Sequence, residues 1–550
     1  MDGYEGVPAE SPTASRNETI IQAQVLEFRE QPASKLASLI ERLPNEILGE
    51  IFIFVMSLFL DSYATDYGEL YCWIPITRVC RHWYNVAVQV PVLWAWISLP
   101  NDETVVELLL RRSKGTSLYV MYDDSNAVPP SDGVTVLKHV LKDHLSRIRD
   151  LFLNINPTAF EEIRDKLSEP APKLTVWHMR TYSRGNDLPE AYLDHQNMPS
   201  LKAFRNSGNY NVPWAKLASM STLRELNLSY DRPRADIMLS KVLDTLVGMP
   251  LLETLRLSGL SIVVGRTTQK ISLARLSLCK VHAPPIICSA ILQHILTPSD
   301  MKMHISHTEL RDTDRPLLMV PVLSKLSGET TLSPPHPIIT LGVICGHDSV
   351  TLYGWRSMVA FEDPTCNGFE EVCTFRVHIR SAEPLADLLK TLPLQSVQQL
   401  QIHSHLFPHE ELSPSEVVDL AMLSDKMPNI STLMCARWPL SSCADVLCNP
   451  YISVSGSGFA WPSLHTLVLQ NVSFRSTGGL LDMVYSPDDG LSIMPLWRGL
   501  LKRQTSGCSI LDRLVIRKCA VKDEDLDLFK QCCDELVSEH NDHRGLSLAA

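Results

Sequence analysis

The chain lacks the features that mark secreted, membrane-spanning and nucleic-acid-binding proteins. Its uncharged apolar run at residues 51–60 is well short of the roughly 20 residues that cross a bilayer. Its formal net charge of −12 argues against nonspecific nucleic-acid binding, because phosphates attract a basic surface. The first residues carry neither the positive charge nor the apolar stretch of a secretory signal. We therefore expect a cytoplasmic or nuclear protein with no membrane or nucleic-acid partner.

Signatures of catalysis and metal binding are also missing. The 14 cysteines include no Cys-x-x-Cys pair, so we expect free thiols in a reducing compartment. The chain has no phosphate-binding Gly-rich loop, no Gly-x-Ser-x-Gly elbow and no His-Glu-x-x-His helix. His403, His405 and His409 form the best metal candidate, but no carboxylate or cysteine is spaced to complete a tetrahedral site. We expect a non-enzymatic protein with no catalytic residue, no metal and no cofactor.

The composition is that of an ordinary folded protein with several parts. Hydrophobic residues make up 45% of the chain and charged residues 20%. A length of 550 residues fits several domains, or one small domain and an elongated array. Residues 1–34 begin with a polar stretch rich in Ser, Pro and Glu, and we expect a disordered or partly helical tail there.

An amphipathic helical pattern begins at Leu43-Pro44. Proline is tolerated in the first turn of a helix, and Ile47, Leu48, Ile51 and Phe52 follow at helical spacing. A second element continues with Val79, Cys80, Arg81, Trp83 and Val86 and closes with Pro91, Val92, Leu93 and Trp94. An isolated apolar helix is most often buried core. The proline start, the Cys-Arg-x-Trp element and the position near the N-terminus favour a surface that binds a partner.

These two elements in this order resemble the F-box, the three-helix module that docks the Skp1 adaptor of cullin-RING ubiquitin ligases. The Pro-x-Leu-Trp close and the following segment, 105–114, also resemble the F-box-like proteins that mushroom-forming fungi carry in large families. We place the module at 35–100, with an inserted loop at about 54–74 that departs from the family pattern. The resemblance implies residues that bind Skp1 or support its binding surface: Leu43, Pro44, Ile47, Leu48, Ile51, Phe52, Val79, Cys80, Trp83 and Val86.

A phrase of the form apolar-x-x-apolar-x-apolar recurs in the rest of the chain. It begins at Ile148, Leu174, Leu201, Leu223, Leu252 and Leu273, and again at Val372, Val397, Ile430, Leu464 and Leu511. In the first series the phrases begin 21–29 residues apart, which resembles leucine-rich repeats of roughly 20–29 residues. In the second series the intervals are looser, at 25–47 residues. Each phrase predicts a short strand with leucines on one face, and a single unit must stack on its neighbours to bury that face.

We therefore predict an α/β fold in which residues 101–550 form an irregular leucine-rich-repeat-like solenoid with a curved parallel sheet. The Asn or Cys that closes regular repeats is mostly missing, which predicts irregularity. Between about 282 and 371 the phrase stops and prolines are frequent. We expect strands at 337–345 and 348–355 within the array, or a join between two solenoid segments.

Several arginines occupy positions that we expect to face outward from the predicted strands. These candidates for substrate binding are Arg256, Arg275, Arg376, Arg513 and Arg517. Guanidinium groups can bind an acidic or phosphorylated peptide, although local Glu and Asp on neighbouring strands can equally pair with them. We expect a substrate-recognition subunit of a Skp1-cullin-F-box type ubiquitin ligase, with a Skp1-like adaptor, a cullin complex and a protein substrate as partners. The alternative is a non-catalytic interaction scaffold without a ligase role.

Overall fold

The computed structural model shows a mixed α/β protein with a large, mostly parallel, curved sheet. It describes residues 43–62, 71, 73–99, 102–124, 133–181, 193–208, 212–265, 267–306, 315–334, 336–346, 349–359, 373–379, 389, 392–404, 420–437, 444, 447, 451–453, 456–472, 494–519, 521 and 523–539. The chain divides into two compact units, Met1–Arg234 and Ala235–Ala550.

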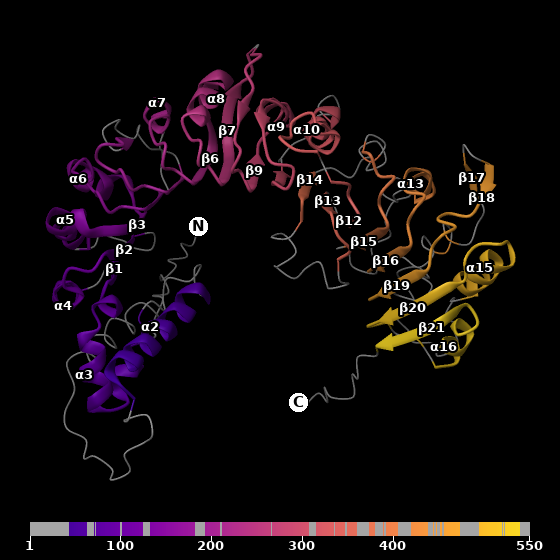
Figure 1. The fold of residues 1–550 in the computed structure, drawn as a ribbon, viewed down its shortest axis with the longest axis horizontal. Helices are drawn as coiled ribbons and strands as arrows, with labels where there is room; N and C mark the ends of the chain where they lie inside the picture. The colour runs from indigo at the N-terminus through magenta and orange to yellow at the C-terminus, as the bar shows by residue number, and fades with distance from the viewer. Residues whose placement is uncertain are drawn as a thin grey trace, which may run out of the picture. The chain divides into compact units, whose positions relative to one another are not determined.

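Unit 1 begins with helices and continues with strands that alternate with helices. Its elements are α2 (Asn45–Ser62), η3 (Ile74–Arg78), α3 (Arg81–Gln89), η4 (Pro91–Trp94), β1 (Trp96–Leu99), α4 (Glu103–Ser113), β2 (Leu118–Asp123), α5 (Gly133–His144), η5 (Leu145–Arg147), β3 (Ile148–Asn154), α6 (Pro157–Leu167), β4 (Val176–Arg180), β5 (Ala203–Ser207), α7 (Trp214–Leu217) and β6 (Glu225–Met238), which runs across the unit boundary. From β1 to β6, every strand pairs in parallel with the next one along the chain. Helices α4 to α7 lie on the outer side of the curve of these strands (Figure 1). We call the opposite side of each unit's sheet its inner face.

Unit 2 repeats this alternation with one interruption. Its elements are α8 (Leu239–Val247), β7 (Thr254–Val263), β8 (Ile271–Ser272), β9 (Leu278–His282), α9 (Pro285–Gln293), β10 (Ile295–Leu296), β11 (Lys302–Ser306), α10 (Arg315–Ser327), β12 (Thr340–Cys345), β13 (Val350–Trp355), β14 (Phe375–Ile379), β15 (Gln399–Ser404), α13 (Leu420–Lys426), β16 (Thr432–Ala436), β17 (Tyr451–Ser453), β18 (Gly456–Gly458), β19 (Thr466–Gln470), α15 (Met494–Thr505), β20 (Leu511–Arg517), α16 (Asp523–Phe529) and β21 (Cys533–Glu539). The main strands lie in the order β7-β9-β11-β14-β13-β12-β15-β16-β19-β20-β21.

The leucine alternation explains why these segments form strands. In β6, Leu226 and Leu228 are fully buried while Asn227 between them is half-buried. Side chains two residues apart share one face of a strand, so the leucines cover the side on which the helices pack. The predicted phrases coincide with β3 to β7, β14 to β16, β19 and β20.

One phrase was placed in the wrong register. We expected Leu273, Leu276 and Leu278 to form it, but β9 begins only at Leu278. Its buried residues are Cys279 and Val281, which lie beside Leu255 and Leu257 of β7. Leu276 precedes the strand, as the equally buried Leu252 does before β7. Because Cys279 and Val281 occupy the positions where the repeat usually has leucines, the leucine pattern indicated the wrong register.

The irregular region at about 282–371 contains strands of the main sheet, as we predicted for 337–345 and 348–355. These two segments are β12 and β13, and β13 pairs antiparallel with both β12 and β14. The antiparallel strand lets β14 return to lie beside β11, so neighbours in the sheet are no longer neighbours in the chain. This change of strand direction explains why the regular spacing of the apolar repeat stops in this region.

The helices offer no candidate for a membrane span. Within the described ranges, none is both long enough and apolar enough to cross a bilayer.

Candidate functional site

The N-terminal helices of unit 1 form a small bundle around α2. Helix α2 packs against α3 and η4, and it buries Leu48, Phe52 and Met56 toward them. These residues recur every four positions and therefore lie on one side of the helix. The ring centroids of Phe52 and Trp83 are 5.1 Å apart, which ties α2 to α3.

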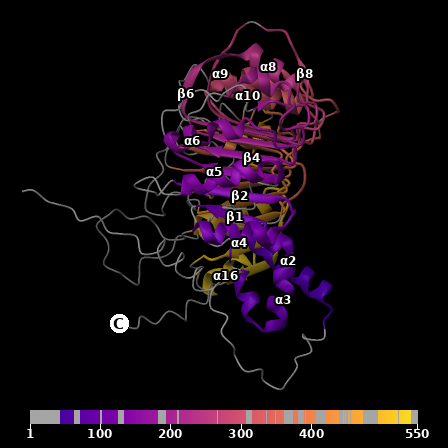
Figure 2. The same ribbon diagram turned by 90° about the vertical axis from the view of Figure 1, so that its left-hand side faces the viewer.

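Polar contacts fix this bundle to the following elements. The Sγ of Cys80 accepts a hydrogen bond from the backbone N–H of Trp83 at 3.5 Å and caps α3. The indole N–H of Trp94 donates to the Ala87 carbonyl at 2.8 Å. The Arg112 guanidinium of α4 lies 4.2 Å from the Trp94 ring centroid and donates to the hydroxyl of Tyr84 at 3.2 Å. The bundle is therefore held beyond the β1 edge of the sheet, as Figure 2 shows.

The other side of α2 carries large apolar side chains that face solvent. The exposed fractions are 49% for Ile47, 39% for Ile51, 62% for Phe54 and 50% for Leu58. We call these four residues the α2 stripe, because intervals of four, three and four residues align them along one helix face. Val79, just before α3, is 60% exposed. Contiguous exposed apolar surface of this kind marks interaction sites.

The ten residues implied by the F-box resemblance separate into two groups. Pro44, Ile47, Ile51 and Val79 are exposed, whereas Leu48, Phe52 and Val86 are buried and support the bundle. The remaining three, Leu43, Cys80 and Trp83, are half-buried.

The sequence reading missed Phe54 and Leu58 because it began the inserted loop at about residue 54. The structure corrects this boundary, since α2 continues to Ser62. The uncharged run and the helical spacing after Ile51 were the signals that could have found both residues.

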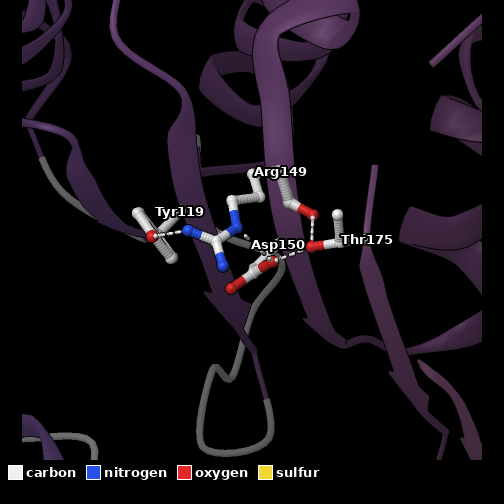
Figure 3. Close-up of polar contacts among 4 residues, drawn as sticks. All are labelled: Tyr119, Arg149, Asp150 and Thr175. Carbon is white, nitrogen blue, oxygen red and sulfur yellow. Dashed lines mark hydrogen bonds and ion pairs between the residues drawn. The ribbon is translucent and has the colours of Figure 1, made fainter. Parts of the chain in front are cut away.

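The inner face of unit 1 holds a cluster of aromatic and charged side chains near β2 and β3. Trp96 stacks on Tyr119 with ring centroids 4.0 Å apart and an interplanar angle of 5°. Arg149 donates to the Tyr119 hydroxyl at 2.7 Å, and the Thr175 hydroxyl donates to Asp150 at 2.7 Å (Figure 3). Burial raises the pKa of Asp150, while the hydrogen bond from Thr175 and the charge of Arg149 act in the opposite direction.

A shallow pocket lies beside this cluster, where β3 to β6 begin. Its volume is about 390 Å³. It is lined by the cationic side chains Arg149, Lys173 and Lys202 and by hydroxyls that include Thr175 and Thr222. The aromatic rings and the guanidinium group of the cluster are of the kinds enriched at protein recognition surfaces, whereas the pocket is lined mainly by lysines, prolines and hydroxyl groups.

His178 on β4 is held neutral at pH 7. Burial, followed by the charges of Arg205 and Arg180, lowers the pKa of His178 to about 4. His403 lies buried on β15, whereas His405 and His409 are outside the described residues. Over the described ranges, no group of three or more His, Cys, Asp or Glu side chains is arranged to hold a metal ion.

The five arginines proposed for substrate binding have different environments. Arg513 and Arg517 pair across strands with Glu535 and Glu539, at 3.2 and 3.1 Å, which is the alternative that the sequence left open. Arg275 is exposed in the turn before β9 and not on the sheet, because the register expected for that strand was wrong.

Arg256 on β7 and Arg376 on β14 do lie on the inner face of unit 2, both half-buried. The guanidinium carbon of Arg376 is 5.7 Å from the Tyr353 ring centroid. The structure adds Lys280, Lys302 and His304 to this region, which the sequence analysis missed because it had not placed β9 and β11 in register.

Neither the known protein-family models nor the curated proteins include a match to this chain. The F-box resemblance therefore depends on the motif residues themselves.

Proposed function

We propose that this chain is the substrate-recognition subunit of a Skp1-cullin-F-box type ubiquitin ligase. The observation that carries the proposal is the α2 stripe, an exposed apolar face of a helix whose other side is buried against α3 and η4. A helix that is apolar on two faces needs a partner for the second one, and a Skp1-like adaptor is the occupant that the flanking Leu43-Pro44 and Cys80-Arg81-x-Trp83 elements favour.

We further propose that the sheet of each unit is an irregular leucine-rich-repeat-type solenoid that binds the substrate. Successive parallel pairing from β1 to β6, each strand with buried leucine or aromatic positions, supports this reading. The ubiquitin chemistry would occur on other subunits. This chain would raise the effective concentration of a bound substrate near the ligase.

The proposal is tested by capturing a purified fungal Skp1 and cullin with the tagged full chain. The variant Ile51→Asp/Phe54→Asp places two charges on the stripe, and we expect at least a tenfold loss of captured adaptor. Burying the exposed half of each side chain contributes about 1 kcal/mol, and a buried unpaired carboxylate adds a further penalty. Because both positions are exposed, the fold should be retained.

The matched control is Val247→Asp/Ile286→Asp, which changes two apolar residues of similar exposure, 55% and 48%, at the end of α8 and the start of α9. This control should capture the adaptor like the unmodified chain. Equal capture by all three proteins would refute adaptor binding through α2.

A second measurement separates a ligase receptor from the scaffold alternative. Affinity purification of the full chain from cells with the proteasome blocked should show a partner that accumulates, and the stripe variant should still hold this partner while losing the cullin. A chain that captures the adaptor and cullin but no accumulating partner would favour the scaffold.

A further inference from the structure

Four adjacent strands of unit 2 place basic side chains at one position of their inner faces. Arg256 of β7 lies beside Lys280 of β9, Lys280 beside His304 of β11, and His304 beside Arg376 of β14. Neighbouring strands are about 4.8 Å apart, so the row spans about 14 Å. Lys302 lies two residues before His304 and on the same face. We call these five residues the basic row.

The pKa of His304 is lowered by burial and by the positive charges gathered around it. Burial lowers the pKa of His304 to about 3, and the next causes are the charges of Lys280, Arg376, Lys302 and Arg256. The imidazole is therefore neutral at pH 7, in the field of four cations. The strands themselves carry no Asp or Glu at the neighbouring inner-face positions.

This arrangement differs from the other arginines of the sheet. Arg205, Arg513 and Arg517 each face a glutamate on the next strand, with the shortest N to O distances between 2.7 and 3.2 Å. In the basic row, Arg256 lies beside Lys280, and Lys280 and Arg376 both lie beside His304. Arg376 also lies beside Tyr353 of β13, and Lys302 lies beside Leu278. These strands therefore place basic side chains next to one another, whereas the strands of Arg205, Arg513 and Arg517 place a cation next to a glutamate.

Hydrogen-bonding groups border the basic row. Arg256 Nε and His304 Nδ1 are shielded from solvent, and neither makes a hydrogen bond within the described part of the chain. Two residues further along these strands, the His282 ring nitrogen Nδ1 lies 2.8 Å from the Ser306 hydroxyl, and the His378 Nδ1 lies 2.8 Å from that of Thr351. Cationic groups next to hydroxyl groups form a surface suited to a ligand with several acceptor oxygens.

We propose that the basic row binds an anionic segment of a polypeptide, either phosphorylated or rich in Asp and Glu. The identification of this peptide as the ligase substrate rests on the proposed function. A peptide is favoured over a nucleic acid because the charge is confined to one row of a chain with net charge −12, which repels a long polyanion. The guanidinium groups of Arg256 and Arg376 would each offer paired donors to a phosphate or carboxylate.

The test uses the full chain and three fluorescein-labelled probes: a degenerate peptide pool with a central phosphoserine, the same pool with serine, and a hexaglutamate peptide. Fluorescence anisotropy should show that at least one anionic probe binds at least tenfold more tightly than the serine pool, and that its affinity falls as salt is raised. Binding of the phosphoserine pool alone identifies a phosphate site, and equal binding of hexaglutamate identifies an acidic-peptide site.

The variant Arg256→Gln/Lys280→Gln removes two charges with little change of shape and should lose at least tenfold in affinity. Its control is Lys270→Gln/Arg275→Gln, which removes two exposed charges from the segment between β7 and β9 and should stay within twofold. Thermal unfolding of both variants verifies that they fold.

Three results would overturn the inference: neither anionic probe binds better than the serine pool, both double variants lose affinity equally, or poly(U) RNA binds more tightly than either peptide. Adaptor capture is measured on the same proteins. If the anionic peptides fail to bind but the adaptor is still captured, the proposed function stands without this site. If the peptides bind but the adaptor is not captured, the ligase role is refuted and the peptide site remains.

Discussion

Lys325 on α10 gives a prediction whose magnitude follows directly from the structure. Its ammonium group is buried and donates to the Thr297 hydroxyl and the Pro298 carbonyl, both at 3.0 Å. Burial is the first cause that lowers the pKa of Lys325 to about 8, followed by the charge of Arg356. The perturbation is Lys325→Met, which has nearly the same length but cannot titrate.

The sign follows from the protons bound in each state. The folded-state pKa of Lys325 lies below its ordinary value of 10.5, so between pH 8 and 10.5 the unfolded chain binds more protons than the folded one. This lysine therefore makes the protein less stable below pH 8, by about 3 kcal/mol for a difference of roughly 2.5 pKa units. About 2 kcal/mol of that should be regained between pH 7 and 9.5.

Urea unfolding at pH 7, 8.5 and 9.5, followed by tryptophan fluorescence, measures the effect in both proteins. Burial raises the pKa of Cys279, Cys288 and Cys345 to about 12, so these thiols make the fold less stable with rising pH and oppose the trend. Cys288 and Cys345 are common to both proteins and cancel in the difference. The charge of Lys325 lowers the pKa of Cys279, so Lys325→Met raises that pKa further above the measured pH range, and the folded-state thiol stays protonated in both proteins. The free energy of unfolding of the unmodified chain should rise relative to Lys325→Met as the pH rises. A difference that stays constant with pH would refute the reasoning.

Two further pairs of substitutions test buried contacts, one beside the α2 stripe and one at Arg503 of α15. Phe52→Ala should lower the free energy of unfolding by about 3–5 kcal/mol, because it removes a buried ring that contacts Trp83. The exposed Phe54→Ala should change that free energy by less than about 0.5 kcal/mol. Equal losses in urea unfolding would show that the α2 stripe is part of the core. Arg503→Met should lower the free energy of unfolding by about 3–5 kcal/mol, because it leaves without a donor three backbone carbonyls to which this buried guanidinium donates at 2.6–3.2 Å. Arg503→Lys should not restore the loss in thermal unfolding, since one ammonium cannot reproduce the planar fork.

The strands could be predicted from the sequence wherever both buried positions of the repeat are leucines. In β6 and β19, the leucine pairs Leu226/Leu228 and Leu467/Leu469 fix both the position of the strand and the side that it buries against the helices. The period of two is a local property, so it can be read without knowledge of the neighbouring strands.

Strand order and register could not be predicted in the same way. β13 runs antiparallel between β12 and β14, and nothing in the residues 350–355 alone specifies that direction. Register pairs residues that are far apart in the chain, such as His304 with Arg376. The basic row exists only through this pairing, which is why the sequence yielded two of its members and missed the other three.

For the α2 stripe, the sequence predicts the helix but not which of its sides is buried. Its helical spacing is present in the sequence, but which of two apolar sides a helix buries depends on the partners that pack against it. Phe52 is buried because Trp83 lies against it, and Phe54, two residues away, faces solvent. Sequence therefore predicts the apolar residues of α2, and only the packing of α3 and η4 assigns them to core or surface.

The two proposed sites are made by different elements, so they can be removed separately, and the consequences differ. The α2 stripe belongs to the helical bundle of unit 1, and the basic row belongs to β7, β9, β11 and β14 of unit 2. A stripe variant would keep its peptide but lose the adaptor, and should protect the peptide-bearing protein from degradation. A basic-row variant would keep the adaptor and lose the peptide, and when overproduced it should compete with other receptors for the same adaptor. Proximity requires both contacts in one chain, so mixing the two single-site variants should not restore turnover of the substrate.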